Sequence, residues 1–204
     1  MTTEMKMAAR RFNHNWAVFL DRDGTVTEEV GYVNHLSRLN LIPGAAEGIR
    51  LLNDVGVPVI LATNQAGVAR GYFDEHLVKA ALEKLGSMLG ALGARLDAVY
   101  YCPHHPAAGE PPYRADCDCR KPKPGMLLRG AKEFGLDLSR SYVIGDKISD
   151  VYFAKAGGAK GILVTTGYGL GELAHQRAGW RCEPHAIVPD VYAASRWIFE
   201  KEGL

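Results

Sequence analysis

The chain has 204 residues, a length that suits one domain or one domain with an insertion. Apolar residues make up 47% of it, which is ordinary for a globular protein and enough for a sizeable core. A net charge of +1, from 24 basic and 23 acidic residues, does not support binding to nucleic acid or to an anionic membrane. No apolar run approaches the roughly 20 residues that a membrane-spanning helix needs.

The N-terminal segment, residues 1–14, is predicted to be a disordered tail. It carries basic residues but lacks the apolar centre of a secretion signal, so we expect a cytoplasmic protein. Residues 15–204 are then predicted to form a single domain.

Short apolar runs alternate with amphipathic segments along this domain. The runs predict strands and the segments predict helices. In chain order these are a strand over 16–20, a helix over 45–55, a strand over 57–62, a helix over 74–92, a strand over 98–101, a helix over 124–134, a strand over 142–144, a helix over 149–156, a strand over 161–165 and a helix over 191–200. The alternation predicts an α/β fold with a parallel sheet between two layers of helices.

Polar and charged side chains follow several of the predicted strands. Asp21 and Asp23 come directly after the first strand, two residues apart and therefore on the same side of it. The others are Thr63, Asn64 and Gln65 after the second strand, Lys121 before the helix at 124, and Asp146 and Asp150 after the fourth strand. Ligands bind at the carboxyl edge of such sheets, so we expect one site there, suited to Mg²⁺ and a phosphate.

Each of these residues also has a purely structural explanation. Thr63 could lie in a turn, Lys121 could lie on a solvated surface, and Asp146 could be the N-cap of a helix. All of them fall at the same predicted edge of the sheet, and this coincidence favours a site that performs chemistry.

A loop rich in proline and cysteine interrupts the alternation after the third strand. Cys102 and His104 are followed, after twelve residues, by Cys117 and Cys119, while Cys182 stands apart as an ordinary thiol. Three thiolates and one imidazole match a closed, tetrahedral structural zinc site within the loop 102–119. His105 is the alternative to His104 as a ligand, although the spacing favours His104. The alternative to a zinc site is a proline-stiffened loop with incidental thiols.

Taken together, the motifs resemble those of the haloacid dehalogenase (HAD) superfamily of phosphohydrolases. That superfamily carries Asp-x-Asp-x-Thr, a Ser or Thr after the second strand, a Lys, and Gly-Asp-x-x-x-Asp, and all four occur here in this order. The resemblance covers about residues 16–170. It implies a three-layer, Rossmann-like fold with a central parallel sheet and no large cap domain.

The resemblance also implies a role for each of these residues. Asp21 would be the nucleophile, and Asp23 would protonate the leaving group and then activate water. Thr63 and Lys121 would bind the phosphoryl oxygens. The Mg²⁺ ligands would be Asp21, the main-chain carbonyl of Asp23 and Asp146, with Asp150 next to them.

Within the superfamily, the motifs are similar to those of the D-glycero-D-manno-heptose 1,7-bisphosphate 7-phosphatases, which act in the synthesis of nucleotide-activated heptose for lipopolysaccharide. Histidinol-phosphate phosphatases share the zinc pattern and are the first alternative. The second alternative is a non-catalytic, zinc-stabilised module that binds sugar phosphates. The resemblance implies a phosphosugar substrate and a monomer. The expected substrate contacts are Asn64, Gln65, Ala66, Arg120, Lys147, Glu29, Val30, Gly31 and Tyr32.

Overall fold

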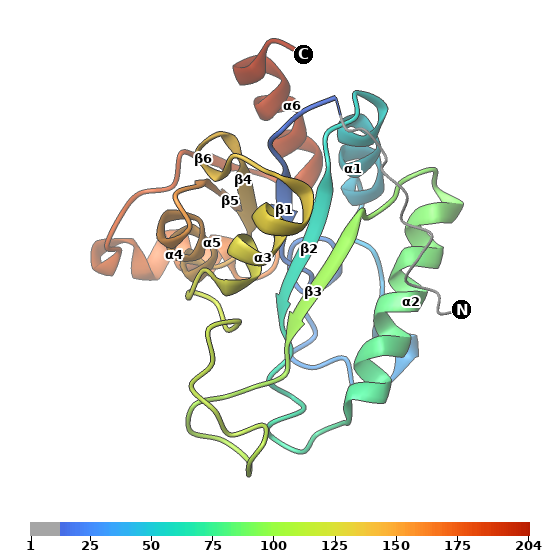
Figure 1. Cartoon of the computed structure of the whole chain (residues 1–204), viewed down its shortest axis with the longest axis vertical. Helices are drawn as coiled ribbons and strands as arrows, with labels where there is room; N and C mark the ends of the chain where they lie inside the picture. The colour runs from blue at the N-terminus through green and yellow to red at the C-terminus, as the bar shows by residue number, and fades with distance from the viewer. Residues whose placement is uncertain (1–12) are drawn as a thin grey trace.

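The computed structural model describes residues 13–204. Its strands form one parallel sheet in the order β3-β2-β1-β4-β5-β6 (Figure 1). Their bounds are Val18–Leu20 (β1), Val59–Asn64 (β2), Ala98–Cys102 (β3), Tyr142–Gly145 (β4), Lys160–Val164 (β5) and Ala186–Val188 (β6). The first five strands were predicted from the sequence and the last was not. Most of the predicted tail lies outside the described residues, but Asn13 donates a hydrogen bond to the Val55 carbonyl at 3.3 Å.

Five helices of nine or more residues connect or follow the strands. They are Ala45–Asp54 (α1), Glu75–Ala91 (α2), Gly125–Phe134 (α3), Ile148–Ala156 (α4) and Val191–Glu202 (α6). Asp74 caps α2, because its carboxylate accepts a hydrogen bond from the main-chain N–H of Leu77 at 3.0 Å. After β5 the chain forms the short α5 (Gly169–Gly171) and a π-helical turn (Glu172–Gln176), which were not predicted.

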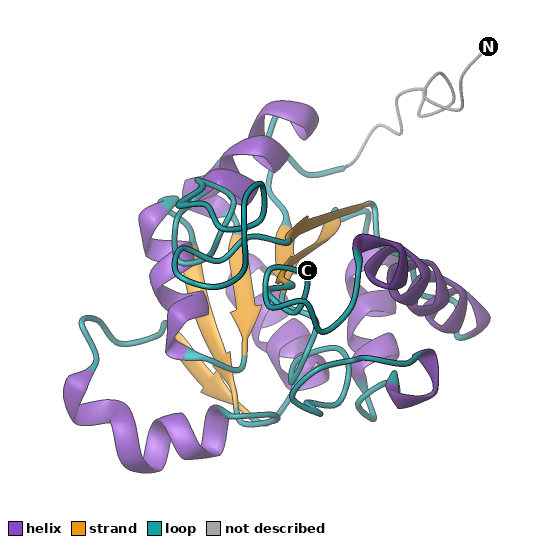
Figure 2. Ribbon diagram, turned by 90° about the horizontal axis from the view of Figure 1, so that it is seen from below, coloured by secondary structure: helices purple, strands orange, loops and turns teal. Residues whose placement is uncertain are grey.

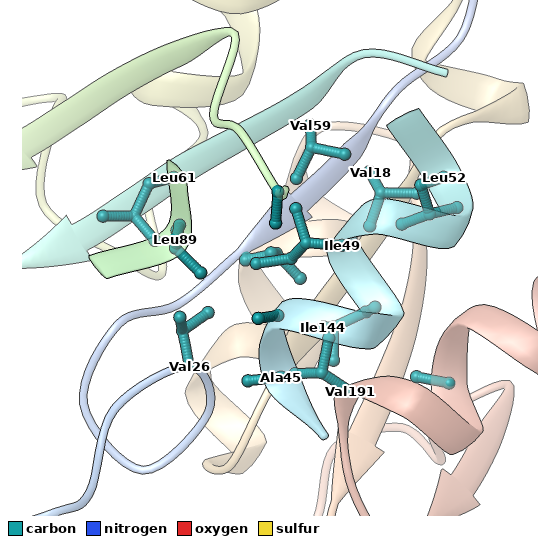
Figure 3. Packing of buried hydrophobic residues seen from close by; sticks show 14 of the residues in the cluster. Val18, Val26, Ala45, Ile49, Leu52, Val59, Leu61, Leu89, Ile144 and Val191 are labelled. Carbon is teal, nitrogen blue, oxygen red and sulfur yellow. The ribbon is translucent and has the colours of Figure 1, made fainter. Parts of the chain in front are cut away.

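Helices cover both faces of the sheet, as the sequence predicted (Figure 2). The side chains of β1 alternate between two buried apolar clusters: Val18 and Leu20 belong to one, and Phe19 belongs to the other. The first cluster joins the sheet to α1, α2 and α6, and Figure 3 shows side chains of α1 packed against those of β1 and β2. The second joins it to α3 and α4. The three layers therefore follow from the two-residue period of the strands.

All neighbouring strands pair in parallel, so their carboxyl ends lie at the same edge of the sheet, and in Figure 1 β2 and β3 point down toward this edge. Loops rather than a second domain surround this edge in residues 13–204, so the expectation of a fold without a large cap is confirmed. Among these residues no helix combines the length and the apolar character that crossing a membrane requires.

Candidate active site

Asp21 follows the central strand β1 and forms an ion pair with Lys121. Its Oδ1 lies 2.8 Å from Lys121 Nζ, which also lies 2.6 Å from Asp150 Oδ1. All three side chains are buried. Burial lowers the pKa of Lys121, but the charges of Asp150 and Asp21 outweigh it and hold that pKa above its ordinary value. Lys121 is therefore a buried ammonium that links β1 to the start of α4, not a solvated surface residue.

Asp146, directly after β4, is fully buried. Its Oδ2 accepts a hydrogen bond from the main-chain N–H of Tyr168 at 2.9 Å, whereas its Oδ1 has no hydrogen-bond partner. Gly24 lies so close that a Cβ at this position would meet Asp146 Oδ2 at 2.1 Å, so the approach requires glycine. Burial and the negative charge of Asp21 raise the pKa of Asp146 to about 8.

The three carboxylates form a cluster with the donor chemistry of a cation site. Asp21, Asp146 and Asp150 each bring a carboxylate oxygen within 4.8 Å of the others. Lys121 alone does not balance this much negative charge, and oxygen ligands of this kind suit Mg²⁺. Asp146 is not the cap of α4: the N-cap is Lys147, whose main-chain N–H donates to Asp150 Oδ2 at 3.3 Å.

The carboxylate of Asp23 is held by two other side chains. Arg22 donates to it from Nε at 2.9 Å and from a terminal guanidinium nitrogen at 2.7 Å. Gln65 Nε2 donates to Asp23 Oδ2 at 3.0 Å and lies 3.0 Å from Thr63 Oγ1. This network joins the loop after β1 to the end of β2. The sequence analysis did not single out Arg22, although it stands between the two aspartates.

Asn64, at the end of β2, contacts the main chain of Lys121. Its Nδ2 donates to the Lys121 carbonyl and its Oδ1 accepts from the Lys121 N–H, each at 3.1 Å. The amide was expected to contact substrate, and in the structure it supports the residue that carries the ammonium.

A cavity of about 420 Å³ opens above these groups. The residues expected to contact substrate and found in its lining are Glu29, Gly31, Tyr32, Asn64, Gln65, Ala66, Arg120 and Lys147. Val30 is not among the lining residues, because its side chain packs against the core. The lining also includes residues that the sequence analysis did not name: Arg22, Val33, Gly67, Ser149 and Tyr168.

Lys147 projects its ammonium between an acidic and an aromatic side chain of this lining. Its Nζ lies 3.3 Å from Glu29 Oε2 and 4.3 Å from the centre of the Tyr168 ring. Burial lowers the pKa of Lys147, but the charges of Asp146 and Glu29 outweigh it and raise that pKa. Lys147 therefore adds a positive charge to a lining that also includes Arg22, Arg120 and Lys121. Tyr168 follows β5, so the rule that ligands bind at strand ends was the signal that could have identified it.

The cysteine-rich loop brings its four expected ligands together. Cys119 Sγ lies 3.2 Å from Cys117 Sγ and 3.5 Å from His104 Nδ1, and Cys102 Sγ lies 3.4 Å from Cys117 Sγ. His105 is oriented elsewhere: its Nε2 lies 3.1 Å from a guanidinium nitrogen of Arg70.

The tip of this loop rests on the turn that follows β2. Gly109 has a φ of +77°, and a Cβ on it would meet the carbonyl oxygen of Ala69 at 1.8 Å. Nearer the base of the loop, the Tyr113 hydroxyl donates to Glu75 at the start of α2 at 2.9 Å. The cysteine-rich loop therefore packs against the turn 65–71, which contributes Gln65, Ala66 and Gly67 to the cavity lining.

Comparisons with known proteins agree with this geometry. A family model described as HAD-hydrolase-like matches residues 118–194. The D-glycero-D-manno-heptose-1,7-bisphosphate 7-phosphatase of Thermosynechococcus vestitus is 45% identical over 188 residues, which cover 89% of this chain and 94% of the relative. The D-glycero-beta-D-manno-heptose-1,7-bisphosphate 7-phosphatase of Pasteurella multocida is 41% identical over 176 residues, which cover 86% and 95%. The chain belongs to the heptose-bisphosphate phosphatase family of the HAD superfamily.

Solved structures of this superfamily have the same fold. The D,D-heptose 1,7-bisphosphate phosphatase from B. bronchiseptica, complexed with magnesium and phosphate, has a TM-score of 0.81 and 32% identity, and the match covers 91% of this chain and 99% of that one. A HAD-like phosphatase from Mesorhizobium loti has a TM-score of 0.73 and 38% identity, over 78% and 77% of the two chains. As a member of the heptose-bisphosphate phosphatase family, the chain is a phosphoric monoester hydrolase.

Proposed function

We propose that this chain removes the 7-phosphate of D-glycero-D-manno-heptose 1,7-bisphosphate, with Asp21 as the nucleophile. The observation that carries the proposal is the pairing of Asp21 with Lys121 at the floor of a polar cavity. An exposed carboxylate would be repelled by a phosphate dianion. The buried ammonium reduces this repulsion and offers a donor for the charge that develops on the transferring group.

In the first step, an oxygen of Asp21 attacks the phosphorus and the bond from phosphorus to the sugar oxygen breaks. Asp23, protonated at this stage, gives its proton to the departing oxygen, which leaves as the heptose hydroxyl. Asp23 is suited to this because its side chain is 21% exposed and lies in the cavity lining. Thr63, at the end of β2, supplies a hydroxyl that binds a phosphoryl oxygen.

In the second step, water attacks the phosphorus of the aspartyl phosphate, and Asp23, now ionised, takes the proton from this water. The bond between Asp21 and phosphorus breaks, which releases inorganic phosphate and returns both carboxylates to their starting state. One carboxylate thus serves as acid and then as base, while the other carries the phosphoryl group between the two steps.

The cluster of Asp21, Asp146 and Asp150 fits a resident Mg²⁺. The buried Asp146 Oδ1 without a partner supports this assignment, since an unpaired buried carboxylate oxygen is costly unless a cation or donor satisfies it. Asp21, Asp146 and the main-chain carbonyl of Asp23 would hold the ion, with Asp150 engaged by Lys121 next to them. Bound there, Mg²⁺ supplies positive charge to the nucleophile and the phosphoryl oxygens.

The second phosphate of the substrate needs cationic partners away from the reacting centre. Arg120 and Lys147 both line the cavity and are the residues that we assign to it. Arg120 is tied to the cysteine-rich loop, because its guanidinium donates to the carbonyl of His104 at 3.1 Å. That loop therefore contributes to substrate choice as well as to the placement of Lys121.

We further propose that Cys102, His104, Cys117 and Cys119 hold a structural Zn²⁺. Four ligands at about 2.3 Å from a tetrahedral ion lie about 3.8 Å apart. Four of the six pairs of ligand atoms lie 3.2–3.7 Å apart and all lie within 4.8 Å of one another, so the site accepts the ion with little movement. Four protein ligands leave no open position, which is the arrangement of a structural rather than a catalytic zinc.

A comparison of substrates tests the proposed reaction. Phosphate release with Mg²⁺ is measured for heptose 1,7-bisphosphate and for histidinol phosphate, with Asp21→Asn as the matched variant. We expect kcat/KM to be at least 100-fold higher for the heptose bisphosphate, the 1-phosphate to remain on the product, and Asp21→Asn to be inactive. Preference for histidinol phosphate would overturn the substrate, and equal inactivity of both chains on a panel of phosphosugars would favour a binding module.

A further inference from the structure

Arg22 is a buried cation whose partner belongs to the reaction. The residue is only 1% exposed, and its guanidinium makes three hydrogen bonds of 2.7–2.9 Å to the two oxygens of Asp23. Both side chains belong to consecutive residues, which a strand would direct to opposite sides. The chain leaves the strand at Asp21, and this allows the guanidinium to turn back onto its neighbour.

The main chain of Arg22 is fixed as firmly as its side chain. Its carbonyl accepts hydrogen bonds from the main-chain N–H groups of Val26 at 2.9 Å and Thr27 at 2.8 Å. Because both the main chain and the guanidinium of Arg22 are fixed by hydrogen bonds, the side chain is a rigid support for Asp23. Because the fork of an arginine matches the two oxygens of a carboxylate, the pair also defines the plane of the Asp23 carboxylate.

Gln65 completes the support from the other side of the cavity floor. Its Nε2 lies 3.0 Å from Asp23 Oδ2 and 3.0 Å from Thr63 Oγ1. The carboxylate is thereby held between the loop after β1 and the end of β2. The exposed part of Asp23 lines the cavity.

We propose that Arg22 is a positioning residue: its buried guanidinium keeps the Asp23 side chain at the cavity, and when Asp23 is protonated one of its oxygens stays bound to the guanidinium while the other, which carries the proton, faces the leaving oxygen. The inference rests on the proposed roles of Asp21 and Asp23, and it is independent of which sugar is bound. A proton donor must lie within about 2.6–3.2 Å of the atom that it protonates, and an unrestrained aspartate samples several staggered rotamers. The restraint therefore acts on the step in which the leaving group departs.

A leaving-group series separates this role from a purely structural one. Strongly basic leaving groups need a proton in order to depart, whereas p-nitrophenolate departs without one. We would measure kcat/KM, which reports the step up to departure, for p-nitrophenyl, phenyl and p-methoxyphenyl phosphate with Arg22→Lys and Arg22→Gln. We expect p-nitrophenyl phosphate to lose less than about threefold and the other two esters to lose about 10–100-fold, since general acid catalysis contributes about 10²–10⁴.

Two comparisons control for general damage. Arg129→Lys breaks another arginine–carboxylate contact, of 2.7 Å to Glu133 on α3, and is expected to leave the series unchanged. The Asp23→Ala chain already lacks the acid. In that chain, adding Arg22→Lys is expected to lower kcat/KM no more for the esters with basic leaving groups than for p-nitrophenyl phosphate. If Arg22→Gln does not fold, Arg22→Lys, which keeps the buried charge but loses the fork, carries the test, with thermal unfolding as the check.

Equal losses across the series, or no loss, would overturn the role of Arg22 while leaving the proposed reaction intact. The same holds if Arg22→Lys retains its full effect in the Asp23→Ala chain. A wild-type chain that releases phosphate from none of these esters and none of the phosphosugars would contradict the proposed function itself, and the role of Arg22 with it.

Discussion

The side-chain amide of Asn64 holds the peptide of Lys121 from both sides, through two hydrogen bonds of 3.1 Å. The ammonium of Lys121 is therefore aimed by β2 as well as by the loop that precedes it. We expect Asn64→Ala to lower kcat/KM about 10–100-fold and to destabilise the fold by about 1–3 kcal/mol, because two buried main-chain groups lose their partners. Asn40→Ala, which removes an exposed bond to Glu28, is the control and should change neither quantity.

The raised pKa of Asp146 predicts that the metal-free protein loses stability with rising pH. The folded pKa of about 8 lies above the unfolded value of about 3.9. The contribution of Asp146 to stability is thus fully present below pH ~4, falls by about 1.4 kcal/mol per pH unit between pH ~4 and about 8, and is lost above the folded pKa. Unfolding in buffer without Mg²⁺ and without a chelator, which would also remove the proposed zinc, should show this decline relative to Asp146→Asn, which cannot titrate.

Mg²⁺ should then restore the stability of the wild type at pH 8 and leave Asp146→Asn unaffected. Parallel pH profiles for the two chains, or equal stabilisation by Mg²⁺, would contradict the placement of Asp146 at the ion.

The neighbouring histidines offer a matched pair for the zinc site. His104 Nδ1 lies 3.5 Å from Cys119 Sγ, whereas His105 contacts Arg70. We expect His104→Ala to lose most of the stoichiometric zinc and several degrees of melting temperature, and His105→Ala to keep its zinc. Elemental analysis of the purified variants measures this directly. Loss of zinc from His105→Ala but not from His104→Ala would reverse the assignment.

Tyr168 should affect the binding of a bisphosphate through Lys147. An ammonium 4.3 Å from an aromatic ring gains about 0.5–2 kcal/mol, which corresponds to about 2–30-fold in affinity. We expect Tyr168→Leu to raise KM for the heptose bisphosphate within that range, and Tyr168→Phe, which keeps the ring, to leave KM unchanged. Equal effects of the two substitutions would assign the role to the hydroxyl instead.

Much of this architecture could be predicted because it depends on local patterns. The two-residue period identifies the strands, and the position of Asp21 or Asp146 directly after a strand places its side chain at the carboxyl edge. The strand Ala186–Val188 escaped prediction because its three half-buried residues are too few to show a period.

The supporting residues could not be predicted in the same way, since their roles depend on contacts between distant segments. The N–H of Tyr168 reaches Asp146 across 22 positions, and the amide of Asn64 reaches Lys121 across 57. Arg22 illustrates another limit: the strand period directs it away from Asp23, and only the turn that ends β1 brings the two together. Sequence patterns thus identify the groups that take part in the reaction. They are less able to identify the residues that position those groups.

Gly109 fixes the contact between the cysteine-rich loop and the turn that follows β2. The glycine lies against Ala69 with no room for even a methyl group, and the same turn contributes Ala66 and Gly67 to the lining. Any side chain at position 109 would push the cysteine-rich loop and the turn apart. The seating of the cysteine-rich loop therefore depends on one missing carbon atom, at a position that takes no part in the reaction.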